Sequence, residues 1–313
     1  GKAGLEQYYE TYLRGKNGER KFYIDNVGRI SEIISSTDSV AGDDLYLSID
    51  ADLQMATYLA LQNEIAAIVY SNIKSGEIPI NDVYTALIGN SVINTEHFSK
   101  SKASDTEKSV LSVFKSRQKT TLGKIKQELT SSPEALNTMS DEVLDEFTYI
   151  ISMLKDDQVL LKNEIDTSDS VYQKWKDQKI SPKEYLNYCI TQHWIDISQL
   201  NVDEKYADST EVYDALCKYI LKNIKTDTEF SKIIYQYMIT RGEISPRQLC
   251  LILFDQGVLD YDDATVNKLK NGSLSPRDFL MKKIYNIEIT PAQLALEPCT
   301  GSCVVTDEKT GEI

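Results

Sequence analysis

The sequence predicts an α+β protein in three parts: a small β-rich segment over residues 1–73, an all-helical segment over residues 74–297 and a short β-hairpin over residues 298–313. Within the first fifty residues, short runs alternate apolar and polar side chains, as strands do. From residue 74 apolar residues recur every three or four positions instead. After residue 297 a short apolar run is followed by a polar turn, so the β pattern returns.

The first predicted element is a β-hairpin. Two extended runs, Lys21–Asp25 and Arg29–Ser35, are separated by Asn26-Val27-Gly28. Glycine tolerates the backbone conformations of tight turns, so Gly28 suits the turn between the two strands. A further strand is predicted over residues 43–50, because apolar and polar residues alternate in DDLYLSID.

A long helix is predicted to follow this strand, from Asp52 to Ile73. Asp50 precedes it and suits the N-cap position, where a carboxylate accepts hydrogen bonds from the first free backbone N–H groups. An apolar stripe is expected along one face of the helix, formed by Tyr58, Leu61, Ile65 and Ile68.

Helix starts in the middle segment are marked by proline. Five of the seven prolines follow Ser or Thr, in SPEAL, SPKEYL, SPRQL, SPRDFL and TPAQL. Ser or Thr suits the N-cap, and proline suits the first helical position, where its missing N–H costs no hydrogen bond. Helices are therefore predicted to begin near residues 132, 181, 245, 275 and 290. Capping boxes are predicted for Ser181 with Glu184, Ser245 with Gln248 and Thr290 with Gln293, and Ser275 with Asp278 approximates one.

These similar helix starts do not make a repeat array. The prolines at 182, 246, 276 and 291 are separated by 64, 30 and 15 residues, whereas a solenoid needs a fixed period. We therefore interpret residues 74–297 as one irregular helical module.

The C-terminal hairpin is predicted from the run Cys303–Val305, a polar turn over residues 307–311, and Glu312-Ile313. The turn contains Lys309-Thr310-Gly311. Lys-Thr-Gly is a motif of penicillin-recognising serine enzymes, which also carry S-x-x-K and an S-x-N type motif. S-x-x-K occurrences include Ser71, Ser99, Ser112 and Ser116, which lie in polar helical or loop stretches, and no S-x-N occurs in the chain. No catalytic residue is predicted.

Composition excludes several classes of function. The net charge is −14 and the pI about 4.7, which argues against a broad nucleic-acid-binding face, although a local basic patch remains compatible with it. No apolar run is long enough to span a bilayer. If the native protein is exported, we expect its signal or anchor before Gly1.

No metal or cofactor site is predicted either. Cys299 and Cys303 have C-x-x-x-C spacing, but His97 and His193 lie far away in sequence, and each histidine is expected to be structural or exposed. The stretch beginning at Asp260 departs from a calcium loop at its sixth and twelfth positions. Cysteines 189, 217 and 250 lie in apolar helical patterns and are expected to be core residues.

The two ends of the chain together resemble class B penicillin-binding proteins. GLEQYYETYLRGKNG, FYIDNVGRI, GDDLYLSIDADLQ and CVVTDEKTGEI follow one another as in the region that leads into the transpeptidase domain of that family. Ser48 replaces the family's threonine. The matching residues include Gly4, Leu5, Glu6, Tyr9, Glu10, Leu13, Arg14, Gly15, Gly18, Asp25, Gly28, Leu47, Ile49, Asp50, Leu53, Gln54, Val304, Val305, Asp307 and Lys309, with Thr310, Gly311, Glu312 and Ile313 completing the last motif.

The resemblance implies that residues 1–73 belong to the non-catalytic pedestal, or dimerisation, segment, and that residues 298–313 begin a truncated transpeptidase domain. Residues 74–297 are then an all-helical insertion at their junction. The family's catalytic Lys-Thr-Gly comes later in its chains, so Lys309-Thr310-Gly311 is expected to be structural. We also expect some of Glu6, Arg14, Asp25 and Asp50 to pair in the pedestal core, because buried charges need partners.

The implied function is non-catalytic and extracytoplasmic. This region supports a membrane-anchored D,D-transpeptidase that cross-links peptidoglycan at the bacterial cell surface, and it presents surfaces to cell-wall assembly proteins. The parent enzyme is expected to act on peptidoglycan peptides and β-lactams. The resemblance does not distinguish division, elongation or sporulation. Two alternatives stay open: a stand-alone helical interaction module, and a serine acylase that uses one of the S-x-x-K sites.

Overall fold

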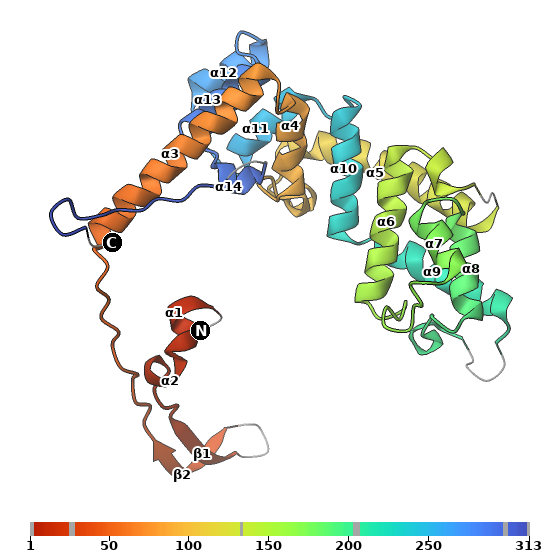
Figure 1. Ribbon diagram of the computed structural model, residues 1–313, viewed down its shortest axis with the longest axis horizontal. Coiled ribbons are helices and arrows are strands. Elements are labelled where there is room, and N and C mark those ends of the chain that lie inside the picture. The colour runs from red at the N-terminus through yellow and green to blue at the C-terminus, as the bar shows by residue number, and fades with distance from the viewer. Residues whose placement is uncertain (1–2, 25–28, 132–133, 203–206, 297–299, 312–313) are drawn as a thin grey trace. The chain divides into compact units, whose positions relative to one another are not determined.

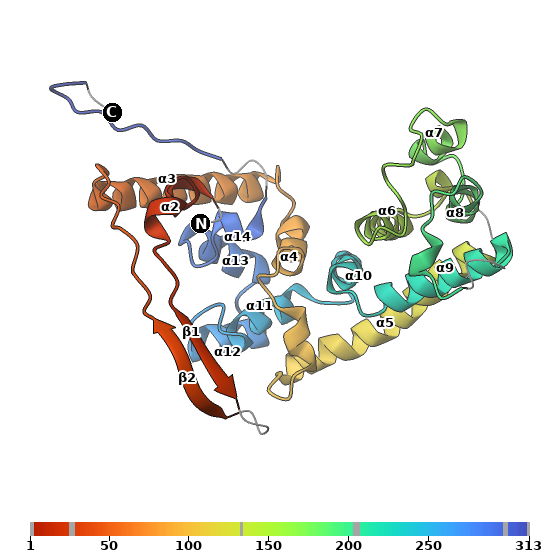
Figure 2. The ribbon, with the colours of Figure 1, turned by 90° about the horizontal axis from the view of Figure 1, so that it is seen from below.

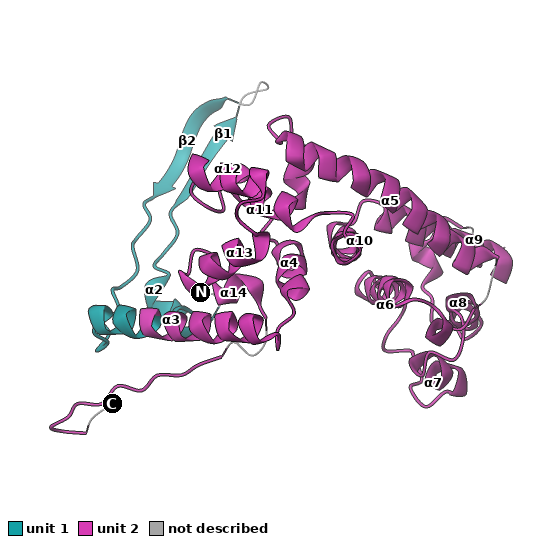
Figure 3. Ribbon diagram, turned by 90° about the horizontal axis from the view of Figure 1, so that it is seen from above, with its two compact units in different colours: residues 1–58 teal, residues 59–313 magenta. Residues whose placement is uncertain are grey.

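The computed structural model divides into two compact units, residues 1–58 and 59–313 (Figure 3). Most described residues are helical, and the described strands form one two-stranded antiparallel sheet. The α+β class is therefore confirmed in coarse form, with helices predominating. The predicted boundaries at residues 73 and 297 remain a prediction. The structure describes residues 3–24, 29–131, 134–202, 207–296 and 300–311.

The first unit contains the predicted hairpin. Strands β1 (Glu19–Ile24) and β2 (Ile30–Thr37) pair antiparallel, with Glu19 opposite Thr37 and Ile24 opposite Ile30. The predicted turn, including Asp25 and Gly28, lies outside the described residues. Two short helices precede the hairpin, α1 (Gly4–Tyr8) and α2 (Glu10–Leu13).

The described part of residues 1–58 has no buried residue. Apolar side chains on both strands are about half exposed, for example Phe22 at 43% and Ile34 at 56%. A two-stranded hairpin is only marginally stable without a covering layer. This unit therefore lacks a core of its own among the residues described.

The strand predicted over residues 43–50 is wrong. These residues form no ladder in the structure, and Tyr46 is 90% exposed. Alternation describes a strand only when a neighbour satisfies its backbone groups, and no described strand pairs with this segment.

The long helix is confirmed as α3 (Ala51–Ser75), and so is its cap. The Leu53 amide donates to Asp50 Oδ1 at 2.9 Å. The predicted stripe is right only at Ile65, which is partly buried against the core. Tyr58 and Ile68 are exposed, and the helix buries Ala66, Val69 and Ile73 instead. Two sets of apolar positions have helical spacing on α3, and spacing alone does not say which one meets the core.

The second unit is built from helices (Figures 1 and 2). Its buried apolar side chains form one continuous core. The 13-residue helix α10 packs against α4, α5 and α6. After α3, the elements are α4 (Ile80–Gly89), η1 (Thr95–Ser99), α5 (Asp105–Thr130), η2 (Leu136–Thr138), α6 (Asp141–Asp156), α7 (Ser170–Lys176), α8 (Pro182–Thr191), η3 (Ile197–Gln199), α9 (Ser209–Ile224), α10 (Thr228–Thr240), α11 (Pro246–Asp255), α12 (Asp263–Asn271), α13 (Pro276–Tyr285) and α14 (Pro291–Leu294).

One type of connection recurs between these helices. After α10, Gly242 has φ +74°, and its amide and that of Glu243 donate to the carbonyls of Ile239 and Met238. This is the Schellman arrangement, which satisfies the free carbonyls of a helix end. The next residue, Ile244, is fully buried. The same pattern recurs in other connections: a residue in the left-handed conformation is followed two positions later by a buried aliphatic residue. The pairs are Gly76 and Ile78, Ser91 and Ile93, Gln158 and Leu160, Gln178 and Ile180, His193 and Ile195, Gly257 and Leu259, and Ile287 and Ile289.

The predicted Ser/Thr-Pro helix starts complete several of these connections. Ser181, Ser245, Ser275 and Thr290 each accept a hydrogen bond from the amide three residues on. Full capping boxes form at Ser245 and Thr290. At Ser181 only one of the two hydrogen bonds forms, from the Glu184 amide to the Ser181 side chain. The start predicted near residue 132 is wrong: residues 132–133 are not described, a 3-10 turn follows at η2, and α6 begins at Asp141.

The predicted C-terminal hairpin is also wrong. Residues 300–307 have no regular secondary structure, and a turn follows at 308–310. A strand needs a neighbouring ladder, and no described segment supplies one here; Glu312 and Ile313 lie beyond the described part. Burial of Cys189, Cys217 and Cys250 is confirmed, and Cys303 is exposed.

We predict that Ile287→Gly raises the free energy of unfolding by about 1 kcal/mol. Ile287 has φ +59°, a left-handed conformation that crowds a β-branched side chain and that glycine adopts freely. Urea unfolding of both proteins measures the change. Gly242→Ala, at φ +74°, serves as the opposite control and should lower stability by about 1 kcal/mol. A less stable Ile287→Gly protein would contradict this interpretation of the connection.

Candidate functional site

The Lys-Thr-Gly triplet forms a turn. Asp307 Oδ1 accepts hydrogen bonds from the Lys309 amide at 2.7 Å and the Thr310 amide at 2.8 Å. These bonds from Thr310 and Lys309 lower the pKa of Asp307. Gly311 has φ +72° and its amide donates to the Asp307 carbonyl at 2.9 Å. Asp307 and Gly311 are thus joined by the hydrogen bonds of this turn.

The S-x-x-K serines are spread over several helices. Ser71 is on α3, Ser99 closes η1, Ser112 and Ser116 are on α5, and a further S-x-x-K serine, Ser152, is on α6, all at exposed positions. A nucleophilic serine needs a neighbouring base and a protected position facing the other motifs. The described residues bring none of these serines to the Lys309 turn within hydrogen-bond distance.

The other predicted structural residues are distributed along the first unit. Gly4 begins α1 with φ +61°, and Leu5 and Glu6 lie exposed on that helix. Arg14 caps the C-terminus of α2 through its amide. Gln54 is in the first turn of α3, where its amide donates to the Asp50 carbonyl.

The expected pairing of charges in the pedestal is not resolved by the structure. Glu6, Arg14 and Asp50 have exposed side chains, and no ion pair joins them within the described residues. Asp25 lies outside those residues, so the pairing stays a prediction.

His97 has a structural partner. Its Nδ1 is 2.7 Å from Glu107 Oε1, and Gln256 Nε2 donates to the same oxygen at 2.7 Å. Burial raises the pKa of Glu107, but hydrogen bonds from Gln256, Ser104 and His97 outweigh it and hold that pKa below its usual range. Glu107 also closes the capping box of α5, so this cluster fixes a helix start.

A charged cluster that includes buried carboxyl groups lies on α5, α6 and the end of α10. Arg117 Nη2 is 2.8 Å from both carboxylate oxygens of Glu142, and Arg241 Nη2 is 2.6 Å from Glu142 Oε2. Arg117 Nη1 also lies 3.6 Å from Glu243. Glu142 is only 3% exposed, and its two arginine partners offset the free-energy cost of burying its charge.

Glu146 lies one turn further along α6 and is 1% exposed. Its Oε1 and the Arg117 Nε have no hydrogen-bond partner within the described residues. Burial, together with the neighbouring charge of Glu142, raises the pKa of Glu146 to about 8, although Arg117 and Lys124 oppose the shift. Glu146 therefore holds a proton at neutral pH.

Sequence reasoning missed this cluster, although a signal existed. Glu142 and Glu146 are four residues apart on a helix, and Ile150 and Leu154 continue the same row into the core. A carboxylate in line with core residues requires a buried partner.

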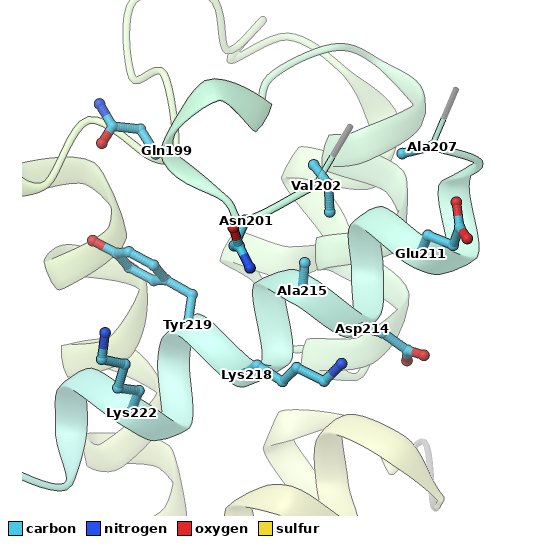
Figure 4. A pocket seen from close by; sticks show the side chains of 10 residues that line it. All are labelled: Gln199, Asn201, Val202, Ala207, Glu211, Asp214, Ala215, Lys218, Tyr219 and Lys222. Carbon is cyan, nitrogen blue, oxygen red and sulfur yellow. The ribbon is translucent and has the colours of Figure 1, made fainter. Parts of the chain in front are cut away.

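A groove of about 700 Å³ lies beside α9 (Figure 4). Asn201 and Gln199 line it from the preceding segment. Along α9, Glu211 and Asp214 lie nearer the N-terminus, and Lys218 and Lys222 lie nearer the C-terminus. This order interacts favourably with the helix dipole, so the charges need no bound ligand to explain them. The groove is thus lined by both apolar residues and charges of both signs.

The described residues contain no helix long and apolar enough to cross a bilayer. They also contain no cluster of three or more His, Cys, Asp or Glu side chains arranged to hold a metal ion.

Comparison with known proteins finds similarity at the N-terminus. Residues 1–47 match the penicillin-binding protein dimerisation domain. The peptidoglycan D,D-transpeptidase FtsI of Escherichia coli is 35% identical over 111 residues, which are 36% of this chain and 18% of that protein. The match is therefore longer than the dimerisation-domain match but covers less than a fifth of the relative.

Two further relatives give matches of similar extent. The peptidoglycan D,D-transpeptidase MrdA of Salmonella typhimurium is 33% identical over 78 residues, 25% of this chain and 12% of MrdA. Penicillin-binding protein 3 of Bacillus subtilis is 40% identical over 77 residues, 25% of this chain and 11% of that protein. No solved structure matches the chain.

We predict that stability falls as the pH rises from about 4.5 to 8, at up to about 1.4 kcal/mol per pH unit from Glu146 alone. In this window the folded chain keeps the Glu146 proton and the unfolded chain releases it. The contribution is complete below pH 4.5 and lost as the pH passes 8. Glu146→Gln removes it, so urea unfolding should show a flatter pH profile for this variant.

Glu164→Gln is the matched control, because Glu164 is exposed and the same change there should leave the pH profile as it is. If Glu146→Gln and the parent chain lose stability in parallel between pH 5 and 8, the buried neutral carboxyl is refuted.

We also predict that Glu142→Gln lowers the free energy of unfolding by about 3 kcal/mol, because it leaves two arginines without their shared carboxylate. Glu229→Gln breaks an ion pair in which the glutamate is 62% exposed, and it should cost less than about 1 kcal/mol. Equal losses for the two variants, measured by urea unfolding, would argue against a special role for the buried cluster.

Proposed function

We propose that this chain, which carries a penicillin-binding protein dimerisation domain at its N-terminus and is a distant, partial homologue of class B penicillin-binding proteins, is a non-catalytic extracytoplasmic region of such a protein. Its role is to hold and orient a D,D-transpeptidase that cross-links peptidoglycan, and to present an interaction surface to cell-wall assembly proteins. The longer protein is anchored in the membrane at the bacterial cell surface.

The observation that carries this proposal is the match of residues 1–47 to the dimerisation domain, together with relatives named as peptidoglycan D,D-transpeptidases. Exposed apolar side chains in the first unit support the interaction surface. Ile24, Ile33 and Ile34 on the hairpin are each more than half exposed. A surface of this kind is typical of a segment that another protein or domain covers.

We further propose that residues 74–297 are an insertion between the pedestal and the start of the transpeptidase domain at residues 298–313. The continuous core of the helical unit supports this, because an inserted domain has to stabilise itself. That same observation favours the alternative, a stand-alone helical interaction module. The two differ in what the gene encodes after residue 313: S-x-x-K, S-x-N and a second K-T-G for the enzyme, or a stop codon for the module.

We predict that residues 1–313 are not labelled covalently by a fluorescent penicillin, because in the described part of the chain no hydrogen bond joins Ser71, Ser99, Ser112 or Ser116 to a basic side chain. The full-length gene product should be labelled at a serine beyond residue 313. Gel fluorescence and peptide mass mapping measure both.

Labelling of residues 1–313 at any S-x-x-K serine, Ser152 included, would establish the serine acylase instead. A full-length product that takes up no penicillin at any serine would overturn the assignment to this class of enzyme.

A further inference from the structure

A small cleft between α3 and α13 gathers positive charge on an acidic protein. It has a volume of about 470 Å³, and Figures 1 and 2 show α13 beside α3. Lys74 lies in the last turn of α3, and Arg277 and Lys282 lie on α13. Within residues 263–285, five basic and two acidic residues give a local charge of +3, against −14 for the chain.

These three cations have no carboxylate partner within the described part of the chain, although the chain has 48 acidic residues. Arg277 Nη2 donates to the Ile73 carbonyl at 3.1 Å, which fixes its guanidinium at the cleft while leaving it charged. The one carboxyl group in the cleft, that of Asp278, accepts from the Ser275 hydroxyl at 2.7 Å. The cleft therefore keeps a net positive charge.

Aromatic and apolar groups form the rest of the cleft. The rings of Tyr70 and Tyr285 meet edge to face at 5.2 Å, and Tyr285 is 55% exposed. Met281 is buried at 5% and lines the same cavity. The cleft can therefore contact a flat or apolar side chain beside an anionic group.

We propose that this cleft binds a short acidic segment of a partner protein, with Asp or Glu side chains at Lys74, Arg277 and Lys282 and an apolar or aromatic side chain against Tyr285. Charge complementarity selects this class of partner. An extended polyanion or an anionic membrane would meet a chain of net charge −14 around the cleft, and repulsion disfavours both. A peptide of a few residues fits within the cleft itself. The inference does not depend on the proposed cell-wall role.

A peptide library tests the proposal. Hexapeptides made of Asp, Glu, Phe, Tyr, Leu and Gly are incubated with residues 1–313, beside a matched library with Asn and Gln in place of Asp and Glu. We expect selective retention from the acidic library. For a retained peptide, fluorescence anisotropy should show affinity reduced about threefold to tenfold in the Lys74→Gln/Lys282→Gln variant, because each exposed ion pair contributes little.

Lys218→Gln/Lys222→Gln is the matched control, because it removes the same charge from exposed positions on α9 and should leave the affinity unchanged. Both lysine pairs are exposed, so unfolding is not expected, and circular dichroism verifies this. Equal retention from both libraries would overturn the proposal, as would loss of affinity in the control alone. So would binding to phosphatidylglycerol vesicles that the Lys74→Gln/Lys282→Gln change abolishes while no acidic peptide binds.

Discussion

The connection between successive helices is the constraint on which the helical unit depends. A left-handed residue ends one helix, a buried aliphatic follows two positions later, and a capped helix begins immediately after it, as at Gly242, Ile244 and Ser245. Backbone groups at both helix ends are satisfied within this short stretch, and the aliphatic side chain ties it to the core. Because so few residues separate the helices, their relative directions are set locally, and an irregular order of short helices can share one core.

The buried charges add a different kind of constraint. Glu142 with Arg117 and Arg241 links α6 to α5 and to the end of α10, and α10 also packs on α4. Charged groups of this kind are costly to bury and specify a partner, whereas aliphatic residues tolerate many. The described part of the first unit has neither a helix connection with a buried aliphatic residue nor a buried charged residue. It has exposed apolar residues on a two-stranded hairpin. An N-terminal segment without a buried core is consistent with a region whose exposed apolar side chains are covered by another protein or domain.

Several features that depend on residues close together in the sequence were predicted correctly. The hairpin, the Asp50 cap and the Ser/Thr-Pro helix starts at 181, 245, 275 and 290 depend on neighbours in sequence, and they were predictable. The strand over residues 43–50 and the C-terminal hairpin depended on partners elsewhere, which alternation does not reveal. The buried face of α3 and the ion cluster of Glu142 and Glu146 depended on tertiary packing. The clustering of Lys74, Arg277 and Lys282 in the cleft could not be predicted, because their spacing in the sequence does not indicate that α3 packs beside α13.

Hydrogen exchange of residues 1–313, followed by mass spectrometry, tests the central claim most directly: that a self-sufficient helical unit is joined to a family segment that needs a covering surface. The account predicts slow exchange in α4 to α13, where the core is, and fast exchange in β1 and β2, whose side chains are exposed. Protection of the hairpin equal to that of α10 and α11 in this chain alone would contradict it.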